Sequence, residues 1–274
     1  MRGNEQLDII KEIITDQWIY RKQLFSLAKS DIMKTYRGAT LGWAWALIKP
    51  TVTIFVFWFA LAIGLRNGTD RGDCPYFLWL IAGIVPWFCM RDSIMAGASS
   101  IKKYKHLVTR IKYPVDTIPT FVIFAQVAIH VLLMFFVLAI FMLTDYGLDI
   151  HTIQIPFYMF FIVVFFSAWG IFAGMISAMS SDFKNLVVSL TTALFWLSGI
   201  LYDVSGIKQV WIKKILSWNP ITLIVDGYRN SLIYRTWFWE NGTPIIHLLI
   251  CCSVMIVLAA WAFKKLRKEI PDVL

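Results

Sequence analysis

A group of charged side chains lies between two long apolar runs, in the segment 98–119. Its cations are Lys102, Lys103, Lys105, Arg110 and Lys112, and its only acid is Asp116. Cations gathered in this way suit contact with anionic lipid or docking of a soluble partner protein. The segment by itself leaves both roles open.

Apolar residues recur at three- and four-residue steps through the same segment, which predicts a short amphipathic helix. They are Ile101, Tyr104, Leu107, Val108 and Ile111. Pro114 and Pro119 are expected to end this helix and to start the next apolar run. Because short basic loops beside membrane spans are retained in the cytoplasm, the segment also sets the expected orientation of the chain.

Motifs for nucleotide binding, metal-dependent hydrolysis or nucleophilic catalysis are absent from the sequence, including GxxxxGK[ST], HExxH, CxxC and GxSxG. Acidic residues within the apolar runs are scarce, which argues against a pump driven by protons or ions. A transporter with neither an ATP site nor an ion relay must take its energy from another protein. An ATPase partner is therefore expected, which favours docking as the role of residues 99–112.

Two polar pairs lie within the apolar runs. Arg91 and Asp92 are adjacent, and an ion pair facing the bundle or the interface is expected because unpaired charges are costly in lipid. Gln126 and His130 are four residues apart and share a helix face, so they predict an interhelical hydrogen bond or a polar line in the bundle.

One polar loop has residues that could bind a metal ion. Asp145, Asp149 and His151 have suitable side chains, but a solvated loop is the preferred interpretation of these residues.

The composition indicates an integral membrane protein. Of the 274 residues, 58% are hydrophobic and 16% are charged, whereas soluble domains average about 45–50% and about 25%. The net charge of +9 gathers near predicted cytosolic ends, which indicates contact with the membrane surface and not with nucleic acid.

The polar first thirty residues predict no cleavable leader. The cysteines, at positions 74, 89, 251 and 252, form neither a disulfide framework nor a metal-ligand spacing.

Six apolar runs are expected to cross the membrane as helices. They cover residues 41–65, 75–95, 118–143, 155–179, 186–201 and 245–263. An even number of crossings puts both termini, including the basic tail 264–274, on the cytosolic side. The predicted fold is an all-α integral membrane protein, with an interface helix in residues 1–40 and a six-span domain in residues 41–274 that includes a basic loop at 98–117.

The segments outside the spans carry further patterns. Residues 5–35 are amphipathic and predict a helix in the plane of the inner leaflet, or one packed on the cytosolic face. Residues 203–242 predict two re-entrant or interfacial half-helices on the outer side. Gly38 and Gly42 predict close approach of another backbone. The same packing is predicted for a small-residue stripe formed by Ser167, Gly170, Gly174 and Ala178.

A series of short motifs in fixed order resembles a known family. The motifs are Tyr36-Arg37-Gly38 with Leu41-Gly42, Trp43 and Trp45 up to Pro50; Ile111-Lys112-Tyr113-Pro114; Ser181-Asp182; and Asn219-Pro220 followed by Asp226-Gly227-Tyr228-Arg229. With them the sequence resembles the six-span permeases of ABC-2 type transporters that export polysaccharides. The stretches 76–80 and 83–88 and the ending Asp272-Val273-Leu274 are most similar to teichoic acid export permeases of Gram-positive bacteria.

The resemblance implies a homodimer in the cytoplasmic membrane with two ATP-binding subunits below it. ATP and Mg²⁺ would be bound in those subunits, and this chain would bind no cofactor itself. The substrate would be a polymer on an undecaprenyl-diphosphate-type lipid. The segment 99–112 would be the helix that couples the permease to the ATPase. The coupling residues would be Ile101, Tyr104, Lys105, Leu107 and Val108.

Two further residue groups follow as hypotheses. Lys29, Lys34 and Arg37 would draw the lipid diphosphate to a lateral entrance, since cations engage phosphate, although anchoring at the cytosolic membrane surface also explains them. An aromatic-lined path would suit a glycan chain, although membrane interfaces use aromatic residues anyway. The residues assigned to the path or the outer gate are Trp43, Trp211 and Tyr228.

Other functions are compatible with parts of the pattern. An O-antigen or capsular polysaccharide permease is the alternative within transport. A membrane-embedded transferase acting on lipid-linked glycans would need a cluster of acids or histidines, for which residues 145–151 are the only candidate. A structural scaffold for a cell-wall machine is a third class. The polymer repeat, and the choice between threading the polymer and flipping its lipid, stay open.

Overall fold

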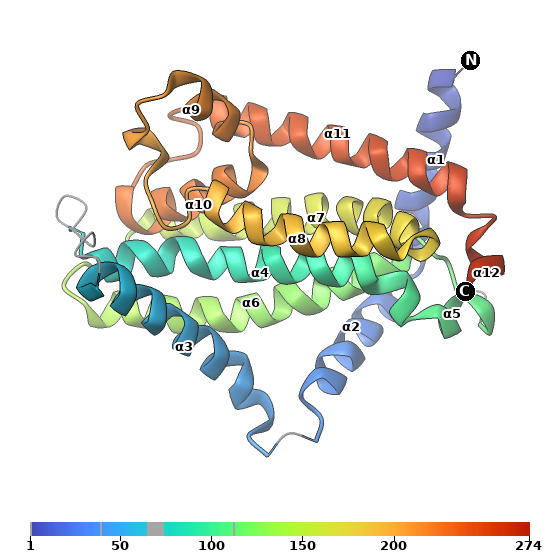
Figure 1. Ribbon diagram of the computed structural model, residues 1–274, viewed down its shortest axis with the longest axis horizontal. Coiled ribbons are helices and arrows are strands. Elements are labelled where there is room, and N and C mark those ends of the chain that lie inside the picture. Colours follow the sequence, from blue (N-terminus) through green and yellow to red (C-terminus); the bar gives the residue numbers. More distant parts are fainter. Residues whose placement is uncertain (1, 39, 65–73, 112) are drawn as a thin grey trace.

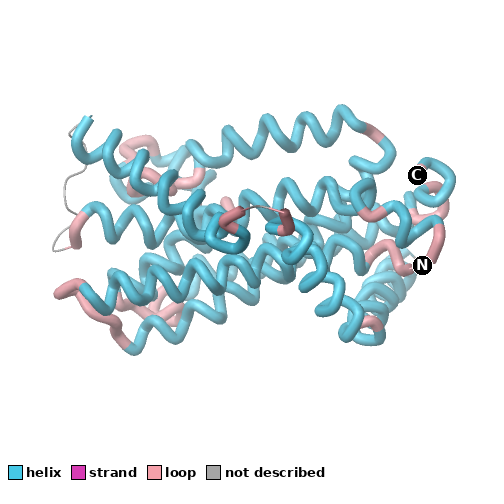
Figure 2. Tube along the Cα trace, turned by 90° about the horizontal axis from the view of Figure 1, so that it is seen from below, coloured by secondary structure: helices cyan, strands magenta, loops and turns pink. Residues whose placement is uncertain are grey.

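The computed structural model describes residues 2–38, 40–64, 74–111 and 113–274, and every regular element in these ranges is a helix (Figure 1). This agrees with the predicted all-α class. Five long helices lie side by side and form the body of a bundle (Figures 1 and 2). They are α4 (Tyr76–Lys103), α6 (Thr117–Leu143), α7 (Ile155–Met179), α8 (Ser181–Leu197) and α11 (Gly242–Leu266).

The helix α4 forms the centre of the bundle and packs against α6, α7 and α8. Of the residues in its most apolar stretch, 83% are buried, and the side chains of Trp79 and Met90 are fully enclosed. A helix that is apolar on all sides is expected to lie in such a position. The second predicted span, 75–95, falls within α4, but the helix continues to Lys103 and so carries the first part of the basic segment 98–119 out of the bundle.

Glycines hold α4 and α7 in close contact. An added Cβ at Gly97 would lie 3.0 Å from the Cα of Gly170, and one at Gly174 would lie 3.1 Å from the carbonyl oxygen of Gly97. Backbones can approach this closely only where side chains are absent. The predicted small-residue packing stripe is therefore confirmed on α7.

Five helical segments of the described residues are long and apolar enough to cross a membrane. They are Gly42–Gly64, Tyr76–Lys103, Thr117–Leu143, Ile150–Met179 and Gly242–Leu266. The remaining predicted span, 186–201, falls on α8, which has 17 residues and lies at the lower end of the length needed. A sixth crossing therefore stays a prediction. Leu65 and residues 66–73 of the expected outer loop lie outside the described residues, as does Lys112.

The first predicted span is built of three helical pieces that lie along one side of the bundle, and the start of the span projects away from it (Figure 1). A 3-10 turn (Gly42–Ala44) leads into α3 (Trp45–Trp58), which ends in a π-helical segment (Phe59–Gly64). Only 11% of the residues in the most apolar stretch of this span are buried. A helix so apolar and so exposed must be covered by lipid or by another protein.

The N-terminal region forms two helices, α1 (Arg2–Ile19) and α2 (Arg21–Tyr36), where the sequence predicted one amphipathic stretch. The helix α2 packs along α6, and α1 packs against α11. Exposed ion pairs join α1 to the end of α11, with 2.5 Å between the charged atoms of Glu5 and Lys264 and between those of Glu12 and Arg267.

The two glycines between α2 and α3 have a different role from the predicted one. Gly38 and Gly42 have φ values of 85° and 48°, and no described atom lies within 4 Å of a Cβ added to either. The prediction of close backbone packing is wrong for this chain. These glycines instead allow the left-handed turns that reverse the chain between α2 and α3.

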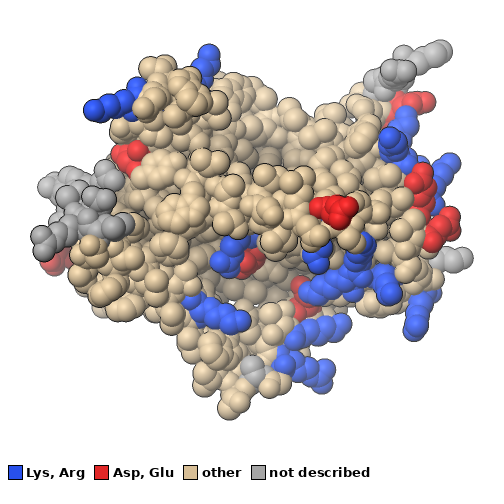
Figure 3. All heavy atoms as spheres, viewed as in Figure 1, with Lys and Arg blue, Asp and Glu red and all other residues tan. Residues whose placement is uncertain are grey.

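Lys and Arg gather toward the end of the bundle that holds both termini (Figures 1 and 3). This end, called the basic end below, also carries α5 (Lys105–Thr109) and α12 (Ile270–Val273). The opposite end, called the far end, carries α9 (Val210–Leu216) and α10 (Pro220–Arg229). A π-helical segment (Asn230–Tyr234) extends α10.

The predicted outer region 203–242 does contain two short helices, and their depth in the membrane stays a prediction. The second helix, α10, starts at Pro220 because the Asn219 side chain caps it by accepting a 3.0 Å hydrogen bond from the backbone N–H of Ile221. A buried face of α10 packs on α4, whereas Trp211 and most of α9 are exposed.

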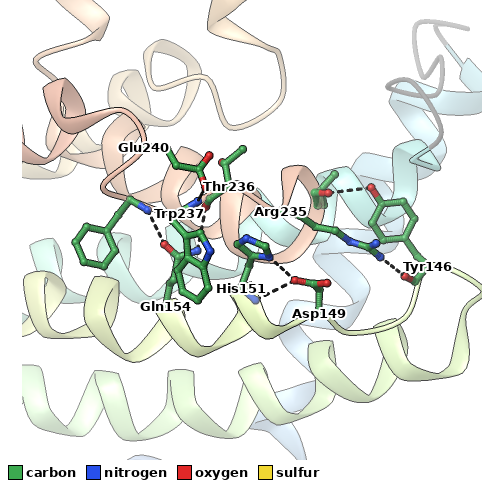
Figure 4. A network of polar contacts seen from close by, with 10 residues as sticks. Tyr146, Asp149, His151, Gln154, Arg235, Thr236, Trp237 and Glu240 are labelled. Atoms are coloured by element: carbon green, nitrogen blue, oxygen red, sulfur yellow. Dashed lines mark hydrogen bonds and ion pairs between the residues drawn. The ribbon is translucent and has the colours of Figure 1, made fainter.

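Polar contacts join the far-end loops before α7 and after α10 (Figure 4). The Gln154 amide donates to the carbonyl oxygen of Thr236 at 3.0 Å and accepts from the backbone N–H of Phe238 at 2.8 Å. Arg235 donates to the carbonyl oxygen of Tyr146 at 2.8 Å. These bonds tie the end of the α10 extension to the bundle.

Candidate functional site

A cavity of about 940 Å³ lies between the C-terminal end of α2, α3, α4 and α6. We call it the α3 cavity. Figure 3 shows a hollow beneath the body of the bundle with charged side chains on its walls. The polar groups in its lining are Thr35, Tyr36, Thr53, Lys49, Arg91, Asp92, Gln126 and His130. The rest of the lining is mainly apolar, which is typical of a ligand site.

The charges in the α3 cavity leave it positive. Arg91 and Asp92 pair with each other, with 2.8 Å between the guanidinium and the carboxylate, as the sequence predicts. Lys49 is exposed and forms no ion pair with any described residue. An ammonium group beside a half-exposed ion pair is a suitable ligand for an anionic group that enters from the side.

His130 forms the inner wall of the α3 cavity. Its side chain is 1% exposed, and its Nε2 lies 2.8 Å from the hydroxyl of Tyr228 on α10. The predicted interhelical hydrogen bond is confirmed for this histidine. Its Nδ1 is buried and has no hydrogen-bond partner among the described residues. Buried polar atoms are usually paired, so this nitrogen is an exception.

Arg229 follows Tyr228 on α10 and is buried toward the far end. Its guanidinium donates to the carbonyl oxygens of Gly199 and Ile200 at 2.8 and 2.7 Å and lies 3.5 Å from the centre of the Trp79 ring. It fits against α4 because position 83 is glycine, where an added Cβ would lie 2.4 Å from Nη2. Tyr228 and Arg229 thus fix α10 in the bundle core.

The predicted coupling residues are distributed over both sides of the basic segment. Lys105 is exposed. Four others, Ile101, Tyr104, Leu107 and Val108, are buried in a cluster with residues of α2, α6 and α7. The apolar side of the predicted helix therefore packs inward on this chain, and the part of these residues in coupling stays a prediction. The side chains exposed there are Lys105, His106, Thr109, Arg110 and Ile111.

The predicted entrance cations lie on the surface of α2 or just after it. Lys29, Lys34 and Arg37 are exposed. None of them belongs to the described lining of the α3 cavity, whose cations are Lys49 and Arg91. Sequence reasoning did not single out Lys49 as a site residue, and the Lys49-Pro50 step within the first apolar run was the available signal.

The three predicted path residues do not come together. Trp43 lies beside Tyr36 at the turn into α3, with 5.3 Å between ring centres, and Trp211 lies on α9 at the far end. Tyr228 is fully buried between these regions. Two of the three contact cavity residues from different sides, Tyr228 through its bond to His130 and Trp43 through its ring contact with Tyr36.

A metal site near residues 145–151 finds no support in the described residues. They contain no group of three or more potential metal ligands. Asp149 and His151 instead bond to each other, and the His151 ring packs on Trp237 with 4.6 Å between ring centres (Figure 4).

Comparison with known proteins decides the family. A sequence model of the ABC-2 type transporter family matches residues 22–233, which is most of the chain. The chain belongs to this family. An ABC-2 permease is the transmembrane subunit of a transporter whose ATP is bound by a separate subunit. Residues 22–233 include the α3 cavity, α10 and all of α2 except its first residue.

Two relatives extend the similarity over nearly the whole ABC-2 permease. The O-antigen export system permease protein RfbA of Myxococcus xanthus is 24% identical over 265 residues, which cover 95% of this chain and 98% of the relative. RfbA of Klebsiella pneumoniae is 20% identical over 262 residues, which cover 92% and 94%. The resemblance to polysaccharide-exporting ABC-2 permeases is thereby confirmed, and the polymer named for both relatives is O-antigen and not teichoic acid.

Proposed function

We propose that the chain is the permease of an ATP-driven exporter of a lipid-linked cell-surface polysaccharide in the cytoplasmic membrane. The observation that carries this proposal is the end-to-end similarity to two O-antigen export permeases. The working unit is a homodimer with two ATP-binding subunits at the basic end, where both termini face the cytosol. ATP and Mg²⁺ belong to those subunits, and the permease itself catalyses no reaction.

An O-antigen-type polysaccharide is the first candidate for the polymer, because both relatives carry that name. Wall teichoic acid is the second candidate. It is supported by the similarity of residues 76–80 and 83–88 and of the ending Asp272-Val273-Leu274 to teichoic acid exporters. Both polymers are carried on a lipid diphosphate, so the same phosphate-binding groups serve either one.

The α3 cavity is suited to the phosphate end of the lipid carrier. Its walls offer the exposed ammonium of Lys49 and the guanidinium of Arg91. Cations on a partly apolar wall bind phosphate strongly because little water competes. The exposed Lys29, Lys34 and Arg37 would attract the headgroup before it reaches the cavity.

The exposed face of α5 is the docking surface for the ATP-binding subunit in this proposal. It presents Lys105, His106 and Arg110, while the apolar face holds α5 to the permease. Such a surface fits an acidic groove on a soluble partner.

Depletion of the chain from its host tests the function and the polymer together. Cells should accumulate one lipid-linked polymer inside and lose it from the surface. Analysis of the accumulated sugar, or of polyol phosphate, then separates the two polymer candidates. Normal surface polymers with nothing accumulated inside would contradict the proposal.

A single substitution tests the cavity. In the reconstituted transporter, Lys49→Gln should raise the concentration of lipid-linked polymer needed for half-maximal export by about tenfold, since about 1.4 kcal/mol of binding is lost. Lys208→Gln, which removes an exposed cation near α9, is the matched control and should leave the value unchanged. Equal values for wild type and Lys49→Gln would remove the α3 cavity from the proposal.

A further inference from the structure

Asp31 on α2 is a buried carboxylate whose partners lie far away in the sequence. It is 3% exposed, and it accepts a hydrogen bond from the Lys103 ammonium at 2.6 Å and another from the Tyr104 hydroxyl. Burial, and then the bond to Asp31, raise the pKa of Tyr104, so the phenol keeps its proton and donates at neutral pH. A buried carboxylate with two such donors holds both of them firmly in place.

Tyr104 lies at the joint between α4 and α5. The helix α4 ends at Lys103, and α5 begins at Lys105. The Tyr104 ring packs edge-on against Phe121 of α6, with 4.9 Å between ring centres. Asp31 therefore fixes the point at which the basic segment leaves the bundle.

The other end of the basic segment is held by the same pair of N-terminal helices. The Gln17 amide donates to a carboxylate oxygen of Asp116 at 3.2 Å. The ring of Tyr20, at the bend between α1 and α2, packs edge-on against Tyr113 with 5.3 Å between centres. The segment 104–116 is thus held at both ends by the α1–α2 pair.

The helix α2 also reaches the α3 cavity. Thr35 and Tyr36, at its C-terminal end, line the cavity, and the Thr35 hydroxyl donates to the carbonyl oxygen of Asp31 at 2.9 Å. One helical turn, about 5.4 Å of rise, separates the cavity wall from the carboxylate that holds Tyr104. A short rigid element therefore contacts both the cavity and the joint of the basic segment.

We propose that Asp31 is a positioning residue that transmits occupancy of the α3 cavity to the segment docked on the ATP-binding subunit. The inference rests on the proposed function. A ligand that displaces the end of α2 moves Asp31, and Lys103 and Tyr104 follow because they are bonded to it. The joint then tilts α5 against the ATPase. Thermodynamic linkage makes this coupling reciprocal. If an occupied cavity changes the affinity of the ATPase for nucleotide by some factor, bound nucleotide changes the affinity of the cavity for its ligand by the same factor.

The test uses the complete transporter, permease with its ATP-binding subunit, in liposomes with and without undecaprenyl diphosphate as the probe. Wild type should hydrolyse ATP faster with the probe. Asp31→Asn and Tyr104→Phe should each reduce this stimulation by about fivefold or more and keep the basal rate within about twofold. The double variant should be no worse than either single one, because both break one link. Asp8→Asn, an exposed acid on α1, is the matched control and should behave as wild type.

Two results would overturn the inference. A parallel fall of basal and stimulated rates would make the contact merely structural, and unchanged stimulation in both variants would remove the link altogether. If Asp31→Asn does not assemble with the ATPase, Tyr104→Phe alone decides, since it deletes only one oxygen. If the wild-type transporter neither responds to the probe nor exports polymer, the proposed function is overturned as well. If wild type responds and exports but the variants behave as wild type, only the role of Asp31 is overturned.

Discussion

The two ends of the bundle hold their short helices in different ways. At the far end, α10 is fixed by Tyr228 and Arg229 inside the core, and its extension is tied down by the Gln154 contacts. At the basic end, the segment 104–116 packs its apolar side on α2, α6 and α7, and its polar bonds go to α1 and α2, whose outer faces are exposed. The segment can therefore keep its polar bonds if it moves together with α1 and α2, whereas movement of α10 requires buried bonds to the core to break.

Arg229→Met should have the largest effect on stability. It leaves the carbonyl oxygens of Gly199 and Ile200 without their donors and removes the cation from the Trp79 ring. Thermal unfolding in lipid nanodiscs should report a loss of about 3–5 kcal/mol. Arg235→Met, which removes an exposed guanidinium bound to one carbonyl oxygen, should cost about 1 kcal/mol or less. Similar losses for both would show that α10 is no more firmly anchored than the surface loops.

Gly83→Ala should have the next largest effect, because the new Cβ would lie 2.4 Å from Nη2 and 3.0 Å from Cζ of Arg229. The guanidinium must shift to relieve this clash, so we expect a loss of about 1–3 kcal/mol in the same unfolding measurement. Gly206→Ala is the control, since no described atom lies within 4 Å of its added Cβ. A neutral Gly83→Ala would mean that the Arg229 contact adapts freely.

The sequence was sufficient for the broad fold because long apolar runs and small-residue spacing have direct physical consequences. Gly170 and Gly174 were assigned correctly because they lie within a long helix, where small residues mark packing faces. Gly38 and Gly42 have the same spacing but lie in a turn, so the spacing alone could not separate the two cases. The apolar face of residues 101–111 was likewise visible, but whether it packs on this chain or on a partner depends on tertiary structure.

The contacts of the candidate sites were largely hidden from sequence reasoning. Asp31 binds Lys103 and Tyr104, which are more than seventy residues away, and nothing in the local pattern of α2 marks it. Lys49 and Arg91 line the same cavity only because the tertiary structure places α3 beside α4. His130 was found because a histidine within an apolar helix requires a buried partner.

The ends should also differ in their response to pH, with a smaller effect. At the basic end, burial and the neighbouring Asp16 raise the pKa of Asp116 from 3.8 to about 7. A carboxyl with a raised pKa binds its proton more tightly in the folded state, so its contribution to stability is highest below pH 3.8 and falls as the pH rises to about 7. At the far end, hydrogen bonds from His151 lower the pKa of Asp149, so its contribution is present at neutral pH and is lost in acid.

Asp116→Asn isolates the basic-end effect. The stability of the variant relative to wild type should increase between pH 4 and pH 7, because only wild type loses the favourable protonated state. Chemical unfolding at a series of pH values measures this difference. Parallel curves for the two proteins over that range would show that Asp116 titrates normally.

The most direct test of the account is ATP-dependent export by the purified components. Inverted vesicles containing this permease, its ATP-binding subunit and a lipid-linked polysaccharide should protect the polymer from added glycosidase only when ATP is supplied. Vesicles without the ATP-binding subunit should give no protection. Protection without that subunit, or none with both subunits and ATP, would contradict the assignment of this chain as an ATP-driven polysaccharide permease.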